Sequence, residues 1–244
     1  MKILISNDDG IFAPGIAALV RAFSAAGHEI FVCAPDSQRS AASHSLTIGR
    51  ELTVREIVFP GAQKAYAISG TPADCVKLGL MVLCPQAEAV VSGINRGYNV
   101  GTDILYSGTV AAAMEGAICG RPAMAVSQSE KREDYDSAAA LAVRLFARMQ
   151  DNPLPPLSVL NVNHPACDEI LGVRTACMGQ LHYTENYIPE NRGDALVYVL
   201  RGEVNESLPQ SEDYALLCGG YATVTAISYD MTDRCTTNGW NTLV

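Results

Sequence analysis

Apolar and polar positions along the first two thirds of the chain alternate in the pattern of strands followed by helices. Short apolar runs are typical of buried strands, and apolar residues three or four positions apart predict helices. A half-exposed hairpin is expected within 46–59, where apolar and polar residues alternate. The other expected strands are 2–6, 28–34, 66–68, 89–93 and 124–127, and the expected helices are 14–26, 72–83, 110–119 and 135–149.

This alternation predicts an α/β fold. We expect a three-layer sandwich in which a mostly parallel, Rossmann-like sheet carries helices on both faces. Gly70 to Asp74 supports one helix start, because Thr71 suits the N-cap, Pro72 the first turn and Asp74 the positive end of the helix dipole.

The pattern changes after the proline-rich segment 152–156. A polar stretch at 179–209 is too long to be a free loop inside a compact domain. We therefore expect a single domain over 1–244 with a projecting C-terminal arm or hairpin within about 179–244, suited to subunit contact, or else a plain surface extension. Strands are expected at 157–162, 172–177, 196–200 and 220–228, with helical turns at 211–218.

Two adjacent carboxylates follow the first strand, where residues 3–11 read ILISNDDGI. Like charges held close together disfavour joint ionisation, so Asp8 and Asp9 need compensation if they are buried. A bound cation would supply it. The plain alternative is that Asn7 to Gly10 is only a turn after a strand.

Ligands of open parallel sheets bind outside the carboxyl ends of the strands. That rule places the loops after several expected strands along one edge. Asp9 points away from Asp8 within a regular strand, but Gly10 relaxes the backbone beyond the strand end, so both can turn inward. All the side chains gathered there offer oxygen, which suits Mg²⁺ or Mn²⁺ more than Zn²⁺. They are Asp8, Asp9, Ser40, Asn95 and Asn99, with the helix starts at Thr71 and at Ser107–Thr109 nearby.

Composition narrows the function classes. An apolar fraction of 48% and a charged fraction of 18% are typical of a globular protein. A formal net charge of −9 argues against binding to nucleic-acid duplexes, which depends on clustered Lys and Arg. The eight cysteines are scattered without a C-x-x-C pair, which favours reduced core cysteines in a cytoplasmic protein. No signal peptide or membrane span is expected.

Five motifs occur in order over roughly the first half of the chain. They are ILISNDDGIFAPGI at 3–16, then APD, RSA and SLT between 34 and 47, GTPADCV at 70–76, VSGINRG at 91–97 and YSGTV at 106–110. Together they resemble the SurE family of survival-protein nucleotidases, and GYATVT at 220–225 adds a weaker similarity.

The resemblance implies a metal-dependent phosphomonoesterase. Its expected substrates are nucleoside 5′- and 3′-monophosphates, with short-chain polyphosphate as a further one, and its expected assembly is a homodimer or homotetramer formed through C-terminal arms. One divalent cation per subunit would be held by Asp8, Asp9, Ser40 and Asn95, with Asp8 and Asp9 also catalytic. The residues expected around the phosphate are Asn7, Gly10, Asn99, Ser107, Gly108 and Thr109. We expect in-line attack on phosphorus by a metal-activated water that Asp8 or Asp9 orients.

The chain departs from the family pattern at three places. Tyr98 stands where Pro is expected, Ala226 also replaces an expected Pro, and 231–244 does not match the family's C-terminal helix. Five side chains have two interpretations each. Asn99 could ligate or only stabilise its loop, Ser107 and Thr109 could contact phosphate or only cap a helix, and Tyr98 could stack on a nucleobase or only pack. His44 is either a loop residue or a general acid for the leaving oxygen.

Three other functions are less consistent with the sequence. A haloacid-dehalogenase-like phosphatase forms a covalent aspartyl-phosphate, but its carboxylates are two positions apart and these are adjacent. A non-catalytic receiver-type signalling module needs a Lys after a late strand, where this chain has Gln128. A dinucleotide-binding domain needs a Gly-x-Gly-x-x-Gly turn, which the loop after the first strand lacks.

Overall fold

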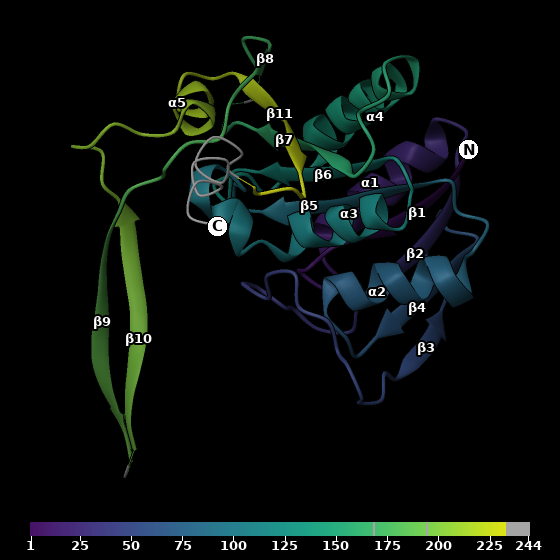
Figure 1. The fold of residues 1–244 in the computed structure, drawn as a ribbon, viewed down its shortest axis with the longest axis horizontal. Helices are drawn as coiled ribbons and strands as arrows, with labels where there is room; N and C mark the ends of the chain where they lie inside the picture. The colour runs from purple at the N-terminus through teal and green to yellow at the C-terminus, as the bar shows by residue number, and fades with distance from the viewer. Residues whose placement is uncertain (168, 194, 233–244) are drawn as a thin grey trace, which may run out of the picture.

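A nine-stranded sheet forms the centre of the structure, a computed structural model that describes residues 1–167, 169–193 and 195–232 (Figure 1). Six neighbouring strands run parallel, β3 and β11 are each paired antiparallel to this group, and β8 pairs in parallel with β11 at the edge. The predicted α/β fold with a mostly parallel sheet is therefore confirmed. In spatial order the strands are β3 (Val54–Ile57), β4 (Lys64–Ile68), β2 (Glu29–Pro35), β1 (Lys2–Ser6), β5 (Ala89–Arg96), β6 (Ala123–Gln128), β7 (Ser158–His164), β11 (Ala222–Ser228) and β8 (Val173–Thr175).

Helices cover both faces of this sheet (Figure 1). The expected helix at 72–83 is α2 continued by the π-helical turn η1 (Gly79–Leu83), and a 3-10 turn η2 (Gly101–Leu105) precedes the third helix. One face packs against α1 (Pro14–Ala25) and α4 (Asp136–Asp151), the other against α2 (Pro72–Leu78) and α3 (Gly108–Ile118), and the short α5 (Glu212–Cys218) lies beside β11.

The core is divided by the sheet because successive strand residues point to opposite faces. Ile3 and Ile5 of β1 lie in the α1–α4 layer, where Phe23 and Phe146 meet edge to face with ring centroids 5.4 Å apart. Leu4 lies in the α2–α3 layer. Each layer therefore fixes one helix pair against the same strand.

The position of β1 in the strand order marks the edge of the sheet where a ligand is expected. The chain moves outward from β1 to β2 and β4, then returns to place β5 on the other side of β1. The direction of the winding reverses between β1 and β5, and ligands bind at such a switch point at the carboxyl ends of the strands. Asp8 and Asp9 follow β1 directly at this point.

The prediction of a hairpin within 46–59 was wrong about its position. Residues 46–53 contain no strand, and the antiparallel pair is β3 with β4, beginning at Val54. The backbone there makes hydrogen bonds to side chains and not to a neighbouring strand. For example, the Thr47 backbone N–H donates to Asp74 Oδ1 at 2.8 Å. The strand expected at 172–177 is also shorter and covers only β8.

The expected arm is a separate antiparallel hairpin of β9 (Tyr183–Arg192) and β10 (Ala195–Val204), which projects from the body in Figure 1. It occupies less of the chain than 179–244, because the chain returns to the body as α5 and β11. Residues 233–244 lie outside the described residues, and with them all but the first two residues of the segment 231–244 that departs from the family pattern.

The described residues contain free cysteines and short helices. Cys33, Cys75, Cys84, Cys119, Cys167, Cys177 and Cys218 are free thiols. No helix in the described part of the chain is long and apolar enough to cross a membrane.

Replacing Gly93 with alanine is expected to destabilise the fold. Gly93 has a φ of +130°, and a Cβ there would lie 2.1 Å from the Val126 carbonyl oxygen, so β5 and β6 must separate. Loss of about 3 kcal/mol or more of unfolding free energy is expected in urea titrations.

Gly120→Ala is the matched control. Gly120 has a φ of +76° but nothing within 4 Å of a Cβ, so only the backbone conformation is penalised, by about 1–2 kcal/mol. Equal losses in the two variants would contradict the close approach of β5 and β6.

Candidate functional site

The end of β1 forms a closed turn. The Asn7 side-chain amide donates to the Gly10 carbonyl at 2.8 Å, and Gly10 adopts a φ of +98°. A Cβ on Gly10 would lie 3.2 Å from the carbonyl carbon of Ser37, so the loop after β2 passes close by. The turn is therefore real, but it also holds Asp8 at only 5% exposure, which a plain surface turn does not do.

Asp8 is held by the beginning of α3. The Thr109 hydroxyl donates to Asp8 Oδ1, and a Cβ on Gly108 would lie 2.8 Å from Asp8 Cβ. Burial raises the pKa of Asp8 to about 6; the Asp9 charge adds to the rise, and the Thr109 hydroxyl and backbone N–H oppose it. The sheet edge and the N-terminal turn of α3 thus enclose one carboxylate.

Asp9 connects three loops. Its Oδ2 accepts from the Arg96 backbone N–H at 3.1 Å, which brings the end of β5 to the end of β1. The Gln38 side-chain amide lies 3.5 Å from Asp9 Oδ1 and donates to Ser40 Oγ at 2.9 Å. Burial raises the pKa of Asp9, and the Arg96 N–H opposes the rise. The loops after β1, β2 and β5 are therefore brought together as expected.

Asn95 is oriented by its own loop. Its side-chain Nδ2 donates to the Gly97 carbonyl at 2.9 Å, which leaves the side-chain oxygen available for a ligand. In contrast, Asn99 is tied to the ends of β6 and β7: its Nδ2 donates to Ser127 Oγ at 2.8 Å, and its backbone N–H to Asn163 Oδ1 at 2.9 Å. Among its contacts within the described residues none is to Asp8 or Asp9, which favours the loop-stabilising role.

Ser107 takes the capping role considered for it, whereas Thr109 makes a contact that was not expected. Ser107 is the N-cap of α3, since its hydroxyl accepts from the Val110 N–H at 3.1 Å. Thr109 instead turns to Asp8. Tyr98 packs beside Val100, Leu181 and Leu217 at the base of the hairpin.

The donor set fits a hard divalent cation. Asn7 Oδ1 is buried and has no hydrogen-bond partner in the described part of the chain, and the carboxylate pair is desolvated. Ser40 bonds to Gln38, which reaches Asp9, and Asn95 precedes Arg96, whose N–H bonds to Asp9. Both side chains offer neutral oxygens. No group of three His, Cys, Asp or Glu residues that could hold a metal occurs among the described residues, so a zinc-type cluster is not present there. An oxygen-only site of two carboxylates matches the preference of Mg²⁺ and Mn²⁺.

Two contributors escaped the sequence analysis. Gln38 lies in a polar loop without a motif of its own, and Arg96 acts through its backbone N–H, which no side-chain pattern reveals. The APD–RSA motif that brackets Gln38 is the one signal that could have drawn attention to it.

Comparisons with known proteins show the family of the chain. A model of the family described as "Survival protein SurE" matches residues 3–185. The chain belongs to the SurE family. A relative from Clostridium beijerinckii named 5′-nucleotidase SurE is 42% identical over 241 residues, covering 96% of this chain and 95% of the relative. Another with the same name, from Thermosynechococcus vestitus, is 44% identical and covers 95% of this chain and 92% of the relative.

A solved structure extends the agreement to three dimensions. The crystal structure of the SurE protein from Aquifex aeolicus superposes with a TM-score of 0.85 at 34% identity, covering all of this chain and 99% of the other. The SurE fold therefore spans the body and the hairpin.

Thr109→Val is expected to lower the unfolding free energy by about 1–3 kcal/mol, because Asp8 loses a donor in a desolvated position. Thr109→Ser keeps the hydroxyl and should lose less. Urea unfolding of both variants checks this, and equal stability of the valine variant and the unaltered protein would contradict it.

Proposed function

We propose that this SurE-family chain is a metal-dependent 5′-nucleotidase that hydrolyses nucleoside monophosphates to nucleoside and phosphate. The proposal extends to nucleoside 3′-monophosphates and to short-chain polyphosphate. The observation that carries it is the pair of buried Asp8 and half-buried Asp9 at the switch point between β1 and β5, with Ser40 and Asn95 on the loops that Asp9 brings together. The names of the relatives supply the substrate class.

One divalent cation, Mg²⁺ or Mn²⁺, would be held by Asp8, Asp9, Ser40 and Asn95. When bound, such a cation polarises a phosphoryl group and lowers the pKa of a water molecule. Burial raises the pKa of both carboxyls, so their ionised forms are disfavoured unless a positive charge lies nearby. The cation would supply that charge.

The chain's own groups would orient the reacting atoms. Thr109 fixes Asp8, while Gln38 and the Arg96 N–H fix Asp9, so either carboxylate can orient the attacking water without rearranging. The N-terminal turn of α3 lies against Asp8, and its N–H groups and dipole favour a phosphate there. Asn7 and Gly10 complete the surroundings of the phosphate on the β1 side.

The alternative functions are less well supported. Asp8 is enclosed and engaged by Thr109, which is unfavourable for a nucleophile that must form an aspartyl-phosphate. Gln128 is fully buried at the end of β6 where a receiver module needs a Lys. Failure to trap an aspartyl-phosphate with labelled substrate would separate the proposed mechanism from the first alternative.

Asp8→Asn is expected to reduce phosphate release from nucleoside 5′-monophosphates by at least about 100-fold, because one of the two carboxylates that would hold the cation loses its charge. The assay uses Mg²⁺ or Mn²⁺, and EDTA should abolish the activity of the unaltered protein. Circular dichroism should show an unchanged fold.

Asp151→Asn is the control, since Asp151 is an exposed carboxylate at the end of α4 and should leave the rate unchanged. Full activity of Asp8→Asn would refute the proposed role of the carboxylate pair.

We also propose that the β9–β10 hairpin joins subunits into a homodimer or homotetramer. Tyr187, Leu196, Tyr198 and Leu200 lie on one face of the hairpin, because Leu200 is directly opposite Tyr187 and the β10 residues alternate. Their exposed fractions range from 49% to 67%. A contiguous exposed apolar face of this kind favours a protein interface.

Tyr198→Ser combined with Leu200→Ser should shift the mass measured by light scattering towards the monomer. Glu203→Ser changes a residue on the opposite face of the same strand and should leave the mass unchanged. An unchanged mass in the double variant would place the subunit interface elsewhere.

A further inference from the structure

Ser40 lies in a segment whose conformation depends on contacts with neighbouring elements. Between β2 and β3 the chain forms no helix or strand, and Ser40 is exposed. Ala41 and Ser43 adopt left-handed conformations, with φ values of 55° and 52°. Non-glycine residues keep such conformations only where surrounding contacts impose them. The contacts that impose this conformation therefore determine where Ser40 lies.

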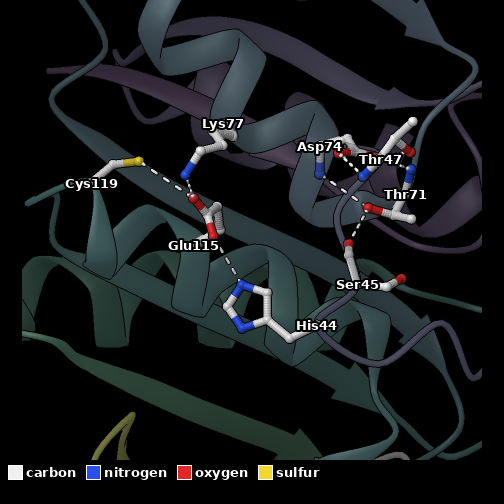
Figure 2. A network of polar contacts seen from close by, with 8 residues as sticks. All are labelled: His44, Ser45, Thr47, Thr71, Asp74, Lys77, Glu115 and Cys119. Carbon is white, nitrogen blue, oxygen red and sulfur yellow. Dashed lines mark hydrogen bonds and ion pairs between the residues drawn. The ribbon is translucent and has the colours of Figure 1, made fainter. Parts of the chain in front are cut away.

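Those contacts come from the elements beneath the segment 39–47, which we call the Ser40 loop. The Ser43 hydroxyl donates to the Leu105 carbonyl at 2.8 Å. Thr71 donates to the Ser45 carbonyl at 2.7 Å, and Asp74 accepts from Thr47 (Figure 2). These bonds hold the distal part of the loop to the beginning of α2 and to the turn before α3.

Glu115 makes a further attachment, from the middle of α3. One carboxylate oxygen lies 2.6 Å from Lys77 Nζ, and the other lies 2.9 Å from His44 Nε2, as Figure 2 shows. The Glu115 side chain is 3% exposed, whereas those of Lys77 and His44 are 41% and 33% exposed. A buried carboxylate is costly unless its partners are present. Glu115 therefore couples α2, α3 and the Ser40 loop at one point.

The same helix also fixes Asp8. Thr109 contacts Asp8 from the first turn of α3, and Glu115 follows six residues later, about 9 Å along the helix axis. Because the helix is rigid over this distance, it sets Asp8 and the Ser40 loop relative to each other. His44 is only four residues from Ser40. The Glu115–His44 contact therefore acts together with two backbone bonds on the same part of the loop, from Ser43 N–H to the Tyr106 carbonyl at 3.1 Å and from Arg39 N–H to the Asp8 carbonyl at 2.7 Å.

We propose that Glu115 is a positioning residue for the metal site: by holding His44, it keeps Ser40 in place to ligate the divalent cation. Its effect is on affinity for the cation and not on the chemical step. The inference rests on the proposed function, because it takes Ser40 as a ligand.

The test measures Mn²⁺ binding without substrate, from the free Mn²⁺ signal in electron paramagnetic resonance titrations. His44→Ala and Glu115→Gln should each raise the Kd for Mn²⁺ at least about 10-fold, the effect typical of groups that orient a ligand. His44→Gln, which retains an N–H donor at the same reach, should restore binding to near the unaltered value. His44→Ala is the safer variant for folding, since it leaves the buried Glu115–Lys77 pair intact.

Ile48→Ala is the control, because Ile48 is 84% exposed at the end of the same segment and should bind Mn²⁺ as the unaltered protein does. Activity provides the second readout. The Mn²⁺ concentration for half-maximal rate should rise in His44→Ala, while kcat at saturating Mn²⁺ stays within about 2-fold.

Two results would overturn the inference. The first is unchanged Mn²⁺ affinity in both His44→Ala and Glu115→Gln. The second is a large loss of kcat in His44→Ala at saturating Mn²⁺ with normal affinity, which would make His44 a general acid. Absence of Mn²⁺ binding by the unaltered protein would instead refute the proposed function, so the two failures are distinguishable.

Discussion

The placement of two adjacent carboxylates at the end of β1, Asp8 buried and Asp9 half-buried, is the constraint on which the rest of the site depends. Both Asp8 and Asp9 have a raised pKa because of burial, so the structure must offset the cost of their charges. Thr109 and the Arg96 N–H offset part of it. These donors come from α3 and from the end of β5, so stabilising the carboxylates also assembles the walls of the site. A divalent cation would supply the remaining compensation.

The topology of the sheet makes this assembly possible. At the switch point the neighbouring strands β1 and β5 end side by side, and the chain leaves them in opposite directions along the sheet. Close approaches then exclude larger residues: a Cβ on Gly108 would lie 2.8 Å from Asp8 Cβ. The helix α3 links the parts, because it contacts Asp8 through Thr109 and the Ser40 loop through Glu115. Rigid elements thus position a site whose ligands lie mostly on loops.

The hydrophobic pattern was sufficient for the parallel sheet, because buried strands and amphipathic helices have different periods. The pattern wrongly predicted a strand at 46–53. The residues there alternate between apolar and polar, but the backbone bonds to side chains, as Thr47 does to Asp74, and not to another strand. Asp8 and Asp9 could be singled out because adjacent acids after a buried strand are costly. Gln38, the Arg96 N–H and the Glu115–His44 contact depend on distances between loops, which residue types alone do not encode.

The most direct measurement of the central claim is anomalous diffraction from crystals grown with Mn²⁺. If the buried carboxylates require a cation, a manganese peak will lie within coordination distance of both Asp8 and Asp9, with Ser40 and Asn95 oxygens next to it. A peak bound elsewhere, or no peak beside the two carboxylates at saturating Mn²⁺, would contradict the claim that this pair is a metal site.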